Sequence, residues 1–356
     1  GRIQGTWTAA KRVSGIYCVD EQTEMLTMAG WRTVDQLEEG LSVVGYDEHK
    51  RGLVDDKLCG VHRFPPTPMI EFSKHQSRFL FTPDHRCPVR LRWKNARGIQ
   101  TKYEVRSAKR LTGHCGLLAS ASMTQRESTI PDRLVRILAW VVADGWIRWD
   151  RPQVLVGQSI VANPDLVARL DGLLEGCASR YVWPATSRLD GMVQWRISGD
   201  VANQVRGLLG ERKHIWKLVE RLTAPQAAMF LREFALGDGE WPAKHDTPDG
   251  DAWPQRLCIY QKDRGIADGL QALAALAGLR SRLRWNGTCY RIGIHARGDA
   301  FWLNTARRRT VMAHAWCPQT GTGYWVARRE GSVFITGNSH PVDALGYGCG
   351  ILYPPE

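Results

Sequence analysis

Residues able to break peptide bonds in their own chain stand near both ends of the sequence. Cys18 follows a polar stretch, and a thiol can attack the carbonyl that precedes it, which converts a peptide bond into a more easily cleaved thioester. Near the other end, Asn338 directly precedes Ser339. The Asn338 side-chain amide can close on its own main-chain carbonyl and cut the chain, while the Ser339 hydroxyl can take over the acyl group. The pattern therefore predicts the joining of Tyr17 to Ser339.

A general acid and a hydrogen-bonding hydroxyl, which the same chemistry needs, occur together in Thr82-Pro83-Asp84-His85. An imidazole has a pKa near neutral, so His85 can protonate the leaving nitrogen. Thr82 can hydrogen-bond the tetrahedral intermediate or fix the orientation of His85. We therefore expect both side chains to serve the bond between Tyr17 and Cys18.

The elements that must position these residues change in type twice along the chain. From Cys18 to about Cys115, short apolar or alternating runs separated by glycines and by the Pro65-Pro66 pair predict a compact all-β region. From about Pro131, apolar residues recur at helical spacing and predict an α+β block, and from about Thr310 the β pattern returns. Later helices are expected over 227–236 and 266–276, and strands over 192–197, 257–261, 290–294, 324–327 and 332–336.

Three segments in register resemble the sequence blocks of inteins. Cys18-Val19-Asp20, with Thr23 and Leu26 to Trp31 after it, resembles the opening block, Thr82 to His85 the Thr-x-x-His block, and Val333 to Ser339 the closing block. The resemblance implies an intein of residues 18–338 between host segments 1–17 and 339–356. It also implies a horseshoe-like all-β (Hint) splicing domain, built from residues 18–127 and 301–338, that needs no cofactor.

The closing block departs from the intein pattern in one position. Inteins usually carry a histidine just before the terminal asparagine, where it assists cyclisation, and here Gly337 occupies that place. Either another group, such as His340 or Arg329, compensates, or this step is slow.

A second departure concerns Cys317, which stands where many inteins carry an aspartate. A minority class with a Trp–Cys–Thr signature uses that cysteine as its first nucleophile, and Cys317 and Thr336 match two of its positions. The expected tryptophan is replaced by Cys87, and that class typically lacks the nucleophile that Cys18 provides. We therefore expect Cys18 to be the first nucleophile and Cys317 an activator or relay, with direct attack by Cys317 as the alternative and a buried structural thiol as the simplest reading.

Two segments of the helical block, Ile137 to Gly145 and Phe230 to Gly239, resemble the paired LAGLIDADG motifs of homing endonucleases. The resemblance implies an α+β endonuclease domain over residues 128–300, whose two motif helices deliver Asp144 and Asp238 to a site for Mg²⁺ or Mn²⁺. Lys213 resembles the active-site lysine of that family, with a solvated lysine as the alternative. Flanking β-sheets would lie along the major groove of double-stranded DNA.

Composition agrees with a polyanionic partner. The 356 residues include 48 Lys and Arg against 36 Asp and Glu, a formal net charge of +12, which favours nucleic acid. The basic clusters Arg307 to Arg309 and Arg328-Arg329 are expected to be solvated faces, with an extension of the DNA-binding surface as the alternative. Nine cysteines without a C-x-x-C pair argue against a disulfide framework and a ribbon-type zinc site. No membrane span or signal peptide is evident, so we expect a cytoplasmic monomer.

The segment from Ser339 to Tyr347 resembles the end of the nuclease domain of phage large terminase subunits. This resemblance implies a host protein in cis of that kind, encoded by a phage or prophage in a bacterial cell. Two rival readings are a free-standing nuclease with β-type accessory domains and a hedgehog-like module that cleaves without joining. The Asn338-Ser339 pair disfavours the second rival, since cleavage alone needs neither residue.

Overall fold

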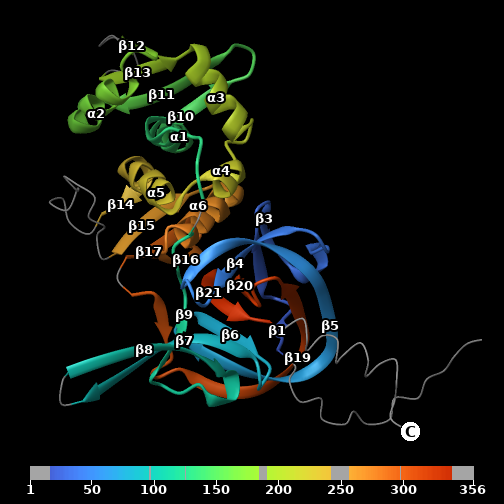
Figure 1. Ribbon diagram of the computed structural model, residues 1–356. Coiled ribbons are helices and arrows are strands. Elements are labelled where there is room, and N and C mark those ends of the chain that lie inside the picture. The colour runs from blue at the N-terminus through green and yellow to red at the C-terminus, as the bar shows by residue number, and fades with distance from the viewer. Residues whose placement is uncertain are drawn as a thin grey trace, which may run out of the picture.

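The computed structural model describes residues 17–95, 98–124, 126–183, 191–241, 256–296 and 298–338. In Figure 1 they form two bodies, a β-rich body from both ends of the chain and an α+β body from the middle. The two ends meet because β1 (Val19–Asp20) pairs with β19 (Arg307–Thr320) and with β6 (Ser77–Phe81). The predicted succession of β, α+β and β segments is confirmed.

Two long strands curve around the β-rich body in Figure 1. β5 (Gly52–Lys74) pairs antiparallel with β19 over almost its whole length. The Pro65-Pro66 pair, expected to separate two strands, lies inside β5, so that expectation is wrong. The ladder is irregular opposite this pair, between Ala313 and Ala315. An irregular site accommodates residues without an N–H, so the strand continues through the prolines.

Shorter strands fill the β-rich body. The larger sheet also contains β2 (Glu24–Thr27), β3 (Gly30–Arg32), β4 (Ser42–Asp47), β20 (Tyr324–Arg329) and β21 (Ser332–Gly337), and a second sheet contains β7 (Arg86–Asn95), β8 (Gly98–Ser107), β9 (Cys115–Leu118) and β18 (Ala300–Trp302). Single-turn 3₁₀ helices cover Val34–Gln36 and Ala108–Arg110. Large aromatic side chains from distant segments fill the core between them: Phe79, Phe81, Trp316, Trp325 and Phe334. Their burial holds the two ends of the chain in one domain.

The α+β body consists of two units with the same topology. The first contains α1 (Asp132–Asp144), β10 (Gly145–Arg148), β11 (Gln153–Ser159), α2 (Pro164–Leu174), β12 (Ala178–Val182), β13 (Met192–Ile197) and α3 (Gly199–Leu209). The second contains α5 (Ala224–Asp238), β14 (Gly239–Glu240), β15 (Arg256–Gln261), α6 (Arg264–Leu276), β16 (Arg280–Trp285) and β17 (Tyr290–His295), after the short linking helix α4 (Trp216–Arg221). The sheet orders, β10-β11-β13-β12 and β14-β15-β17-β16, correspond strand by strand. The body is therefore a structural repeat.

The first helices of the two units pack against each other. α1 buries eight of its residues, and Leu134, Ile137, Leu138 and Val141 recur at the helical spacing seen in the sequence. α5 begins with a capping box in which the Thr223 hydroxyl accepts from the Gln226 N–H, an arrangement that satisfies donors left free at a helix start. The two helices make extensive contact along their length.

A buried arginine joins the two bodies. Arg328 on β20 is 1% exposed and donates to Glu24 on β2 at 2.6 Å and to Asp268 on α6. Its guanidinium also lies over the Trp31 ring, 4.5 Å from the centroid. Arg329, 2% exposed, pairs with Asp20. The expectation of a solvated face is thus wrong for Arg328-Arg329, because acidic partners from other strands and from α6 surround both side chains.

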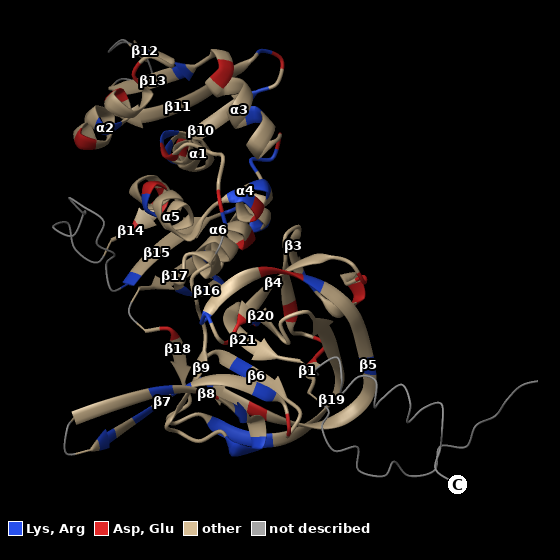
Figure 2. Ribbon diagram, viewed as in Figure 1, with Lys and Arg blue, Asp and Glu red and all other residues tan. Residues whose placement is uncertain are grey.

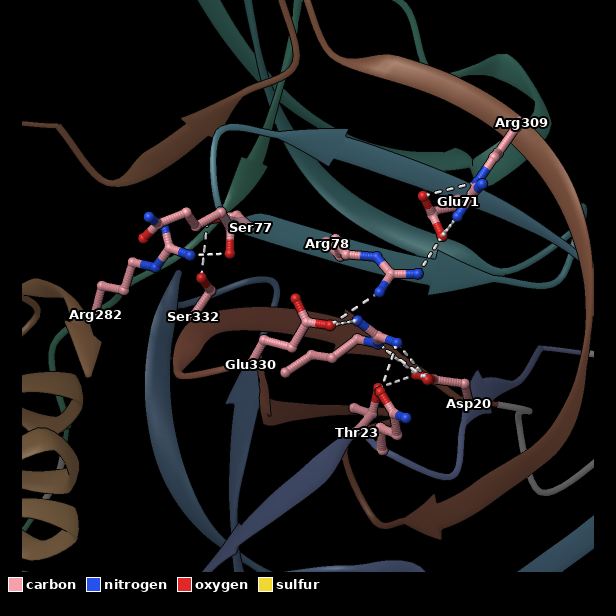
Figure 3. Close-up of polar contacts among 12 residues, drawn as sticks. Asp20, Thr23, Glu71, Ser77, Arg78, Arg282, Arg309, Glu330 and Ser332 are labelled. Atoms are coloured by element: carbon pink, nitrogen blue, oxygen red, sulfur yellow. Dashed lines mark hydrogen bonds and ion pairs between the residues drawn. The ribbon is translucent and has the colours of Figure 1, made fainter. Parts of the chain in front are cut away.

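Further ion pairs connect the strands of the β-rich body. In Figure 3, Glu71 accepts from both Arg78 and Arg309, and Arg78 also reaches Glu330. The Ser77 and Ser332 hydroxyls lie 2.9 Å apart, close to the single paired position, Arg282 with Ser332, that links the sheets of the two bodies.

Among the described helices, none has the length and apolarity needed to cross a membrane.

Candidate functional site

The peptide bond between Tyr17 and Cys18 lies at the centre of the β-rich body. Cys18 is fully buried, and its N–H donates to the Thr82 hydroxyl at 2.9 Å. The Thr82 N–H in turn donates to the Cys18 carbonyl at 3.1 Å. Thr82 therefore contacts the nitrogen that would leave if the bond were cleaved.

The carbonyl side of the same bond is held by Cys317. Its thiol donates to the Tyr17 carbonyl oxygen at 3.0 Å, and the side chain is 1% exposed. The register of β1 with β19 places Cys317 opposite Cys18, and the two thiols interact. Burial raises the pKa of the Cys18 thiol far above its ordinary value, and Cys317 raises it further. Both candidate nucleophiles thus meet one bond, and both alternatives for the first attack stay open.

His85 is buried behind this bond. Its Nε2 atom lies 2.5 Å from the Thr336 hydroxyl, and its ring stacks on Phe81 with 4.9 Å between centroids. Burial lowers the pKa of His85 to about 3, an effect that the Tyr17 main chain partly opposes and Arg86 strengthens. The imidazole is therefore neutral at pH 7, and it must take up a proton before it can donate one.

The last described residue, Asn338, is also fully buried, and its N–H donates to the Gly323 carbonyl at 3.0 Å. A Cβ atom at Gly337 would lie 2.7 Å from the Cβ of Arg86 and 2.8 Å from its carbonyl oxygen, so no histidine fits there. Ser339 and His340 lie outside the described residues. Arg329 cannot compensate, since it is committed to Asp20.

The two motif helices end side by side in the α+β body. A Cβ atom at Gly237 of α5 would lie 2.6 Å from the Asp144 carboxylate at the end of α1. At Gly145 and Gly239, which follow the two aspartates, a Cβ would come within 2.6 Å of Val141 and 2.3 Å of the Ala235 carbonyl. Glycine at 237 therefore permits the close approach of α5 to the end of α1, while the glycines after the two aspartates let the chain turn tightly against the last turn of its own helix.

Electrostatics show that the two carboxylates share a site. Burial and, to a smaller extent, the charge of Asp144 raise the pKa of Asp238 to about 6, against the opposing charge of Lys213. Burial also raises the pKa of Asp144, opposed by Lys213 and by a hydrogen bond from Gln158 at 3.2 Å. Lys213 is partly buried and donates to the Val142 and Gly145 carbonyls at 3.1 and 2.9 Å. The alternative of a solvated lysine is wrong.

Oxygen donors of this kind fit a divalent cation. Two adjacent carboxylates repel each other, and a hard cation such as Mg²⁺ or Mn²⁺ relieves that repulsion. Within the described residues, no group of three or more His, Cys, Asp or Glu side chains gathers around one point. Asp144 and Asp238 would therefore supply part of a coordination shell, and water or a phosphate group would complete it.

The second sheet of the α+β body presents a basic face. Its Leu257, Ile259, Leu283 and Ile292 side chains are buried in the core, so alternate residues face the other way. That opposite face carries Arg256, Arg280, Arg282, Arg284, Arg291 and His295, which the register aligns in rows; Arg256 and Arg284 are exposed and the other four are partly buried. Burial lowers the pKa of Arg282 to about 10, and the charge of Arg284 contributes. Figure 2 shows blue segments on β15 and on the β7–β8 hairpin.

Positive charges that crowd on one face repel one another, and a bound polyanion would relieve that repulsion. A cavity continues the basic face into the β-rich body, where Lys74, His75, Arg92 and His114 line it together with Arg280. The sequence alone did not identify this face, because the alternating arginines of β16 join Arg291 and His295 of β17 in one surface only through strand register. Gln158 and Arg86 were missed for a similar reason, since neither belongs to a recognised motif.

No protein-family model matches the sequence, and no curated protein matches it. Several solved structures show limited similarity to about half of the chain. I-DmoI in complex with DNA and Mn has 12% identity and a TM-score of 0.33, covering 47% of this chain and 90% of that chain. The homing endonuclease I-WcaI bound to its DNA recognition sequence has 12% identity and a TM-score of 0.35, covering 48% and 78%. The N-terminal LAGLIDADG domain of DUF199/WhiA has 11% identity and a TM-score of 0.30, covering 47% and 76%.

Proposed function

We propose that this chain is a self-splicing intein, residues 18–338, that excises itself and joins Tyr17 to Ser339. The observation that carries this proposal is the set of contacts on one peptide bond. The Thr82 hydroxyl accepts from its N–H, the Cys317 thiol donates to its carbonyl oxygen, and the Cys18 thiol lies beside it. Three hydrogen-bonding or nucleophilic groups, among them the side chain of Cys18 itself, converge on one buried peptide bond, and this arrangement favours cleavage of that bond.

The first step follows from the protonation states. Because both the Cys18 thiol and the His85 imidazole are neutral, the thiol proton passes to the imidazole as the sulfur attacks the Tyr17 carbonyl carbon. Cys317 donates to the oxygen on which negative charge develops. His85 then returns the proton to the leaving nitrogen of Cys18, and Thr336, bonded to Nε2, fixes the ring. The product is a thioester with a free amine at Cys18.

The remaining steps release the intein. The Ser339 hydroxyl attacks the thioester, which transfers the acyl group of Tyr17 to Ser339. Asn338 then cyclises, cutting its bond to Ser339, and the ester rearranges to a peptide bond. In the alternative pathway the Cys317 thiol attacks the Tyr17 carbonyl first, and its position 3.0 Å from the oxygen supports that option as well.

The α+β body supports a second activity, site-specific cleavage of double-stranded DNA. A divalent cation held by Asp144 and Asp238 would activate water and stabilise the leaving oxygen of a phosphodiester. Lys213 lies between the end of α1 and both carboxylates, where it lowers their negative field. The arginine face of β15, β16 and β17 would bind the phosphate backbone.

The host of such an intein is the protein to which residues 1–17 and 339–356 belong. The resemblance of the segment Ser339 to Tyr347 to phage large terminase subunits supports a host protein of that kind, expressed in the cytoplasm of a bacterial cell. The host segments lie outside the described residues, apart from Tyr17.

A time course of freshly expressed protein tests the proposal. Splicing yields residues 18–338 as one band and a joined peptide of residues 1–17 and 339–356, identified by mass spectrometry. A hedgehog-like module would give unjoined flanking peptides, and a free-standing nuclease would remain whole. Persistence of the intact chain after long incubation with a thiol reductant overturns the proposal.

A further inference from the structure

The side chain of Asn338 is held by a single hydroxyl. Its Nδ2 atom donates to the Thr320 Oγ1 atom at 3.1 Å, and both residues are at most 1% exposed. Its Oδ1 atom is buried and has no hydrogen-bond partner among the described residues. Nδ2 is the atom that must attack the Asn338 carbonyl carbon during cyclisation, so Thr320 contacts the reacting atom.

Thr320 is held rigidly at the start of a tight turn. Its hydroxyl faces the Tyr324 carbonyl at 3.5 Å, to which it can donate, and the Gly323 N–H donates back to the Thr320 carbonyl at 3.2 Å. Asp56 accepts from the Gly321 and Thr322 N–H groups at 3.0 and 2.9 Å and fixes the middle of the turn. With its own proton directed at Tyr324, the Thr320 oxygen offers a lone pair to Asn338.

The turn requires a glycine at position 323, which lies next to Asn338 in space. Gly323 has φ +74°, which side chains rarely adopt, and a Cβ there would lie 3.5 Å from the Asn338 Oδ1 atom. On the other side Gly337 is pressed against Arg86. Arg86 stacks on the Tyr324 ring at 4.8 Å and donates to its hydroxyl, which donates to Glu48 at 2.8 Å. Position 337 therefore has no room for a histidine, and a histidine at position 323 would have a strained backbone.

We propose that Thr320 is a catalytic residue of asparagine cyclisation in this chain and performs the orienting task that a histidine beside the asparagine performs elsewhere. This inference rests on the proposed splicing function. By accepting from Nδ2, the Thr320 oxygen holds the carboxamide in one rotamer and draws electron density onto the attacking nitrogen. The Nδ2–C bond forms and the bond between the Asn338 carbonyl and the nitrogen of residue 339 breaks. One Nδ2 proton ends on the leaving amine, and the products are a succinimide and a free amino group.

The experiment uses the full chain with Ser339→Ala, a change that blocks acyl transfer and lets each junction be scored separately. Dithiothreitol then reports the thioester at Cys18 through release of residues 1–17, while spontaneous release of residues 339–356 reports cyclisation. In this parent we compare Thr320→Val, which keeps the shape and removes the acceptor, with Thr320→Ser, which keeps the acceptor. Thr322→Val is the matched control, because its hydroxyl bonds Asp56 and Tyr324 rather than Asn338.

We expect Thr320→Val to slow the release of residues 339–356 about tenfold or more, with thiol-induced release of residues 1–17 unchanged. The release rate of residues 339–356 in Thr320→Ser is expected to stay within about threefold of the parent rate. The control Thr322→Val is expected to cyclise faster than Thr320→Val. An unchanged rate in Thr320→Val overturns the inference alone. Equal loss at both junctions in Thr320→Val and in Thr320→Ala also overturns it, since the role would then be structural. A parent that cleaves at neither junction overturns the proposed function together with the inference.

Discussion

The Cys317 thiol donates a hydrogen bond to the Tyr17 carbonyl oxygen over 3.0 Å, although 300 residues separate the two in sequence. Strand pairing of β1 with β19 creates this contact. A donor at that distance would polarise the carbonyl for the proposed attack by Cys18, and the same sulfur could itself become the nucleophile after losing its proton. The two roles can be told apart by whether the thioester still forms when one of the two cysteines is replaced.

The first prediction separates these roles. Cys18→Ala is expected to abolish the thioester at residue 17, because Cys18 would supply the attacking sulfur. Cys317→Ala is expected to slow thioester formation about tenfold to a hundredfold while leaving it detectable, since one donor to the developing oxyanion is lost. Release of residues 1–17 by dithiothreitol, quantified by mass spectrometry, measures both rates. Full splicing in Cys18→Ala with none in Cys317→Ala would assign the first attack to Cys317.

A second prediction concerns the pH dependence of stability. The folded pKa of His85 is about 3, below the ordinary 6.5, so the folded state resists protonation that the unfolded chain accepts. The stabilising effect of neutral His85 is complete above pH 6.5 and is lost progressively as pH falls towards 3. Between pH 7 and pH 5 we expect about 2 kcal/mol of the free energy of unfolding to be lost through this residue.

Urea unfolding measures this loss in a splicing-inactive background, Cys18→Ala with Asn338→Ala. The same background with His85→Gln is the control, because it retains every other titrating group, including His295, whose pKa is likewise lowered, to about 4. On acidification, the free energy of unfolding should fall more for the protein that retains His85 than for the variant that carries His85→Gln. Identical losses would show that His85 is accessible to protons in the folded state.

The third prediction tests the acidic pair. Asp144→Asn combined with Asp238→Asn should eliminate metal-dependent DNA cleavage and leave splicing unchanged, because the pair lies in the α+β body. In the absence of metal, Asp238→Asn alone should raise the melting temperature, since burial and, secondly, the neighbouring Asp144 disfavour a charge at this position. Differential scanning calorimetry with and without Mg²⁺ measures the second effect. Metal that stabilises the Asn variant as strongly as the parent would place the cation elsewhere.

The fourth prediction concerns the basic face. Arg284→Ala should weaken DNA binding. It should also reduce the slope of log affinity against log salt concentration by about one, as expected for the loss of one phosphate contact. Arg307→Ala is the matched control, because Arg307 is an exposed arginine at the start of β19, outside this face. Fluorescence anisotropy over a range of salt concentrations distinguishes the two variants. Equal effects would indicate that only the net charge matters.

The sequence predicted the type of each segment well, because the evidence was local. The helix expected over 227–236 lies within α5, and the strand over 192–197 appears with the predicted bounds. Contacts that depend on register were beyond such reasoning. Neither the approach of Cys317 to Tyr17 nor the bond from Thr320 to Asn338 follows from spacing along the chain. Each arises where two strands or a turn bring residues together from distant positions.

Burial was the other quantity that local patterns could not supply. Arg328-Arg329 has the composition of an exposed cluster, and its burial depends on Glu24, Asp20 and Asp268, which come from three separate segments. The pKa of His85 is likewise set by the core around it rather than by its neighbours in the Thr-x-x-His segment. Sequence reasoning therefore identified the chemistry of these side chains better than their environment.

The fifth prediction concerns Arg328, which links the β-rich body to the α+β body. Arg328→Met preserves the volume of the side chain but leaves Glu24 and Asp268 without their shared partner. Removing one member of a buried ion-pair network costs about 3 to 5 kcal/mol, and we expect a loss of that size in urea unfolding. Arg308→Met, at an exposed position on β19, should change stability by less than about 0.5 kcal/mol. Arg328→Met combined with Asp268→Asn should recover part of the loss, because the second change removes a negative charge that has lost Arg328 and keeps only Arg264 as an ion-pair partner among the described residues. A purely additive double variant would mean that Arg328 stabilises its own body only and that α6 docks without it.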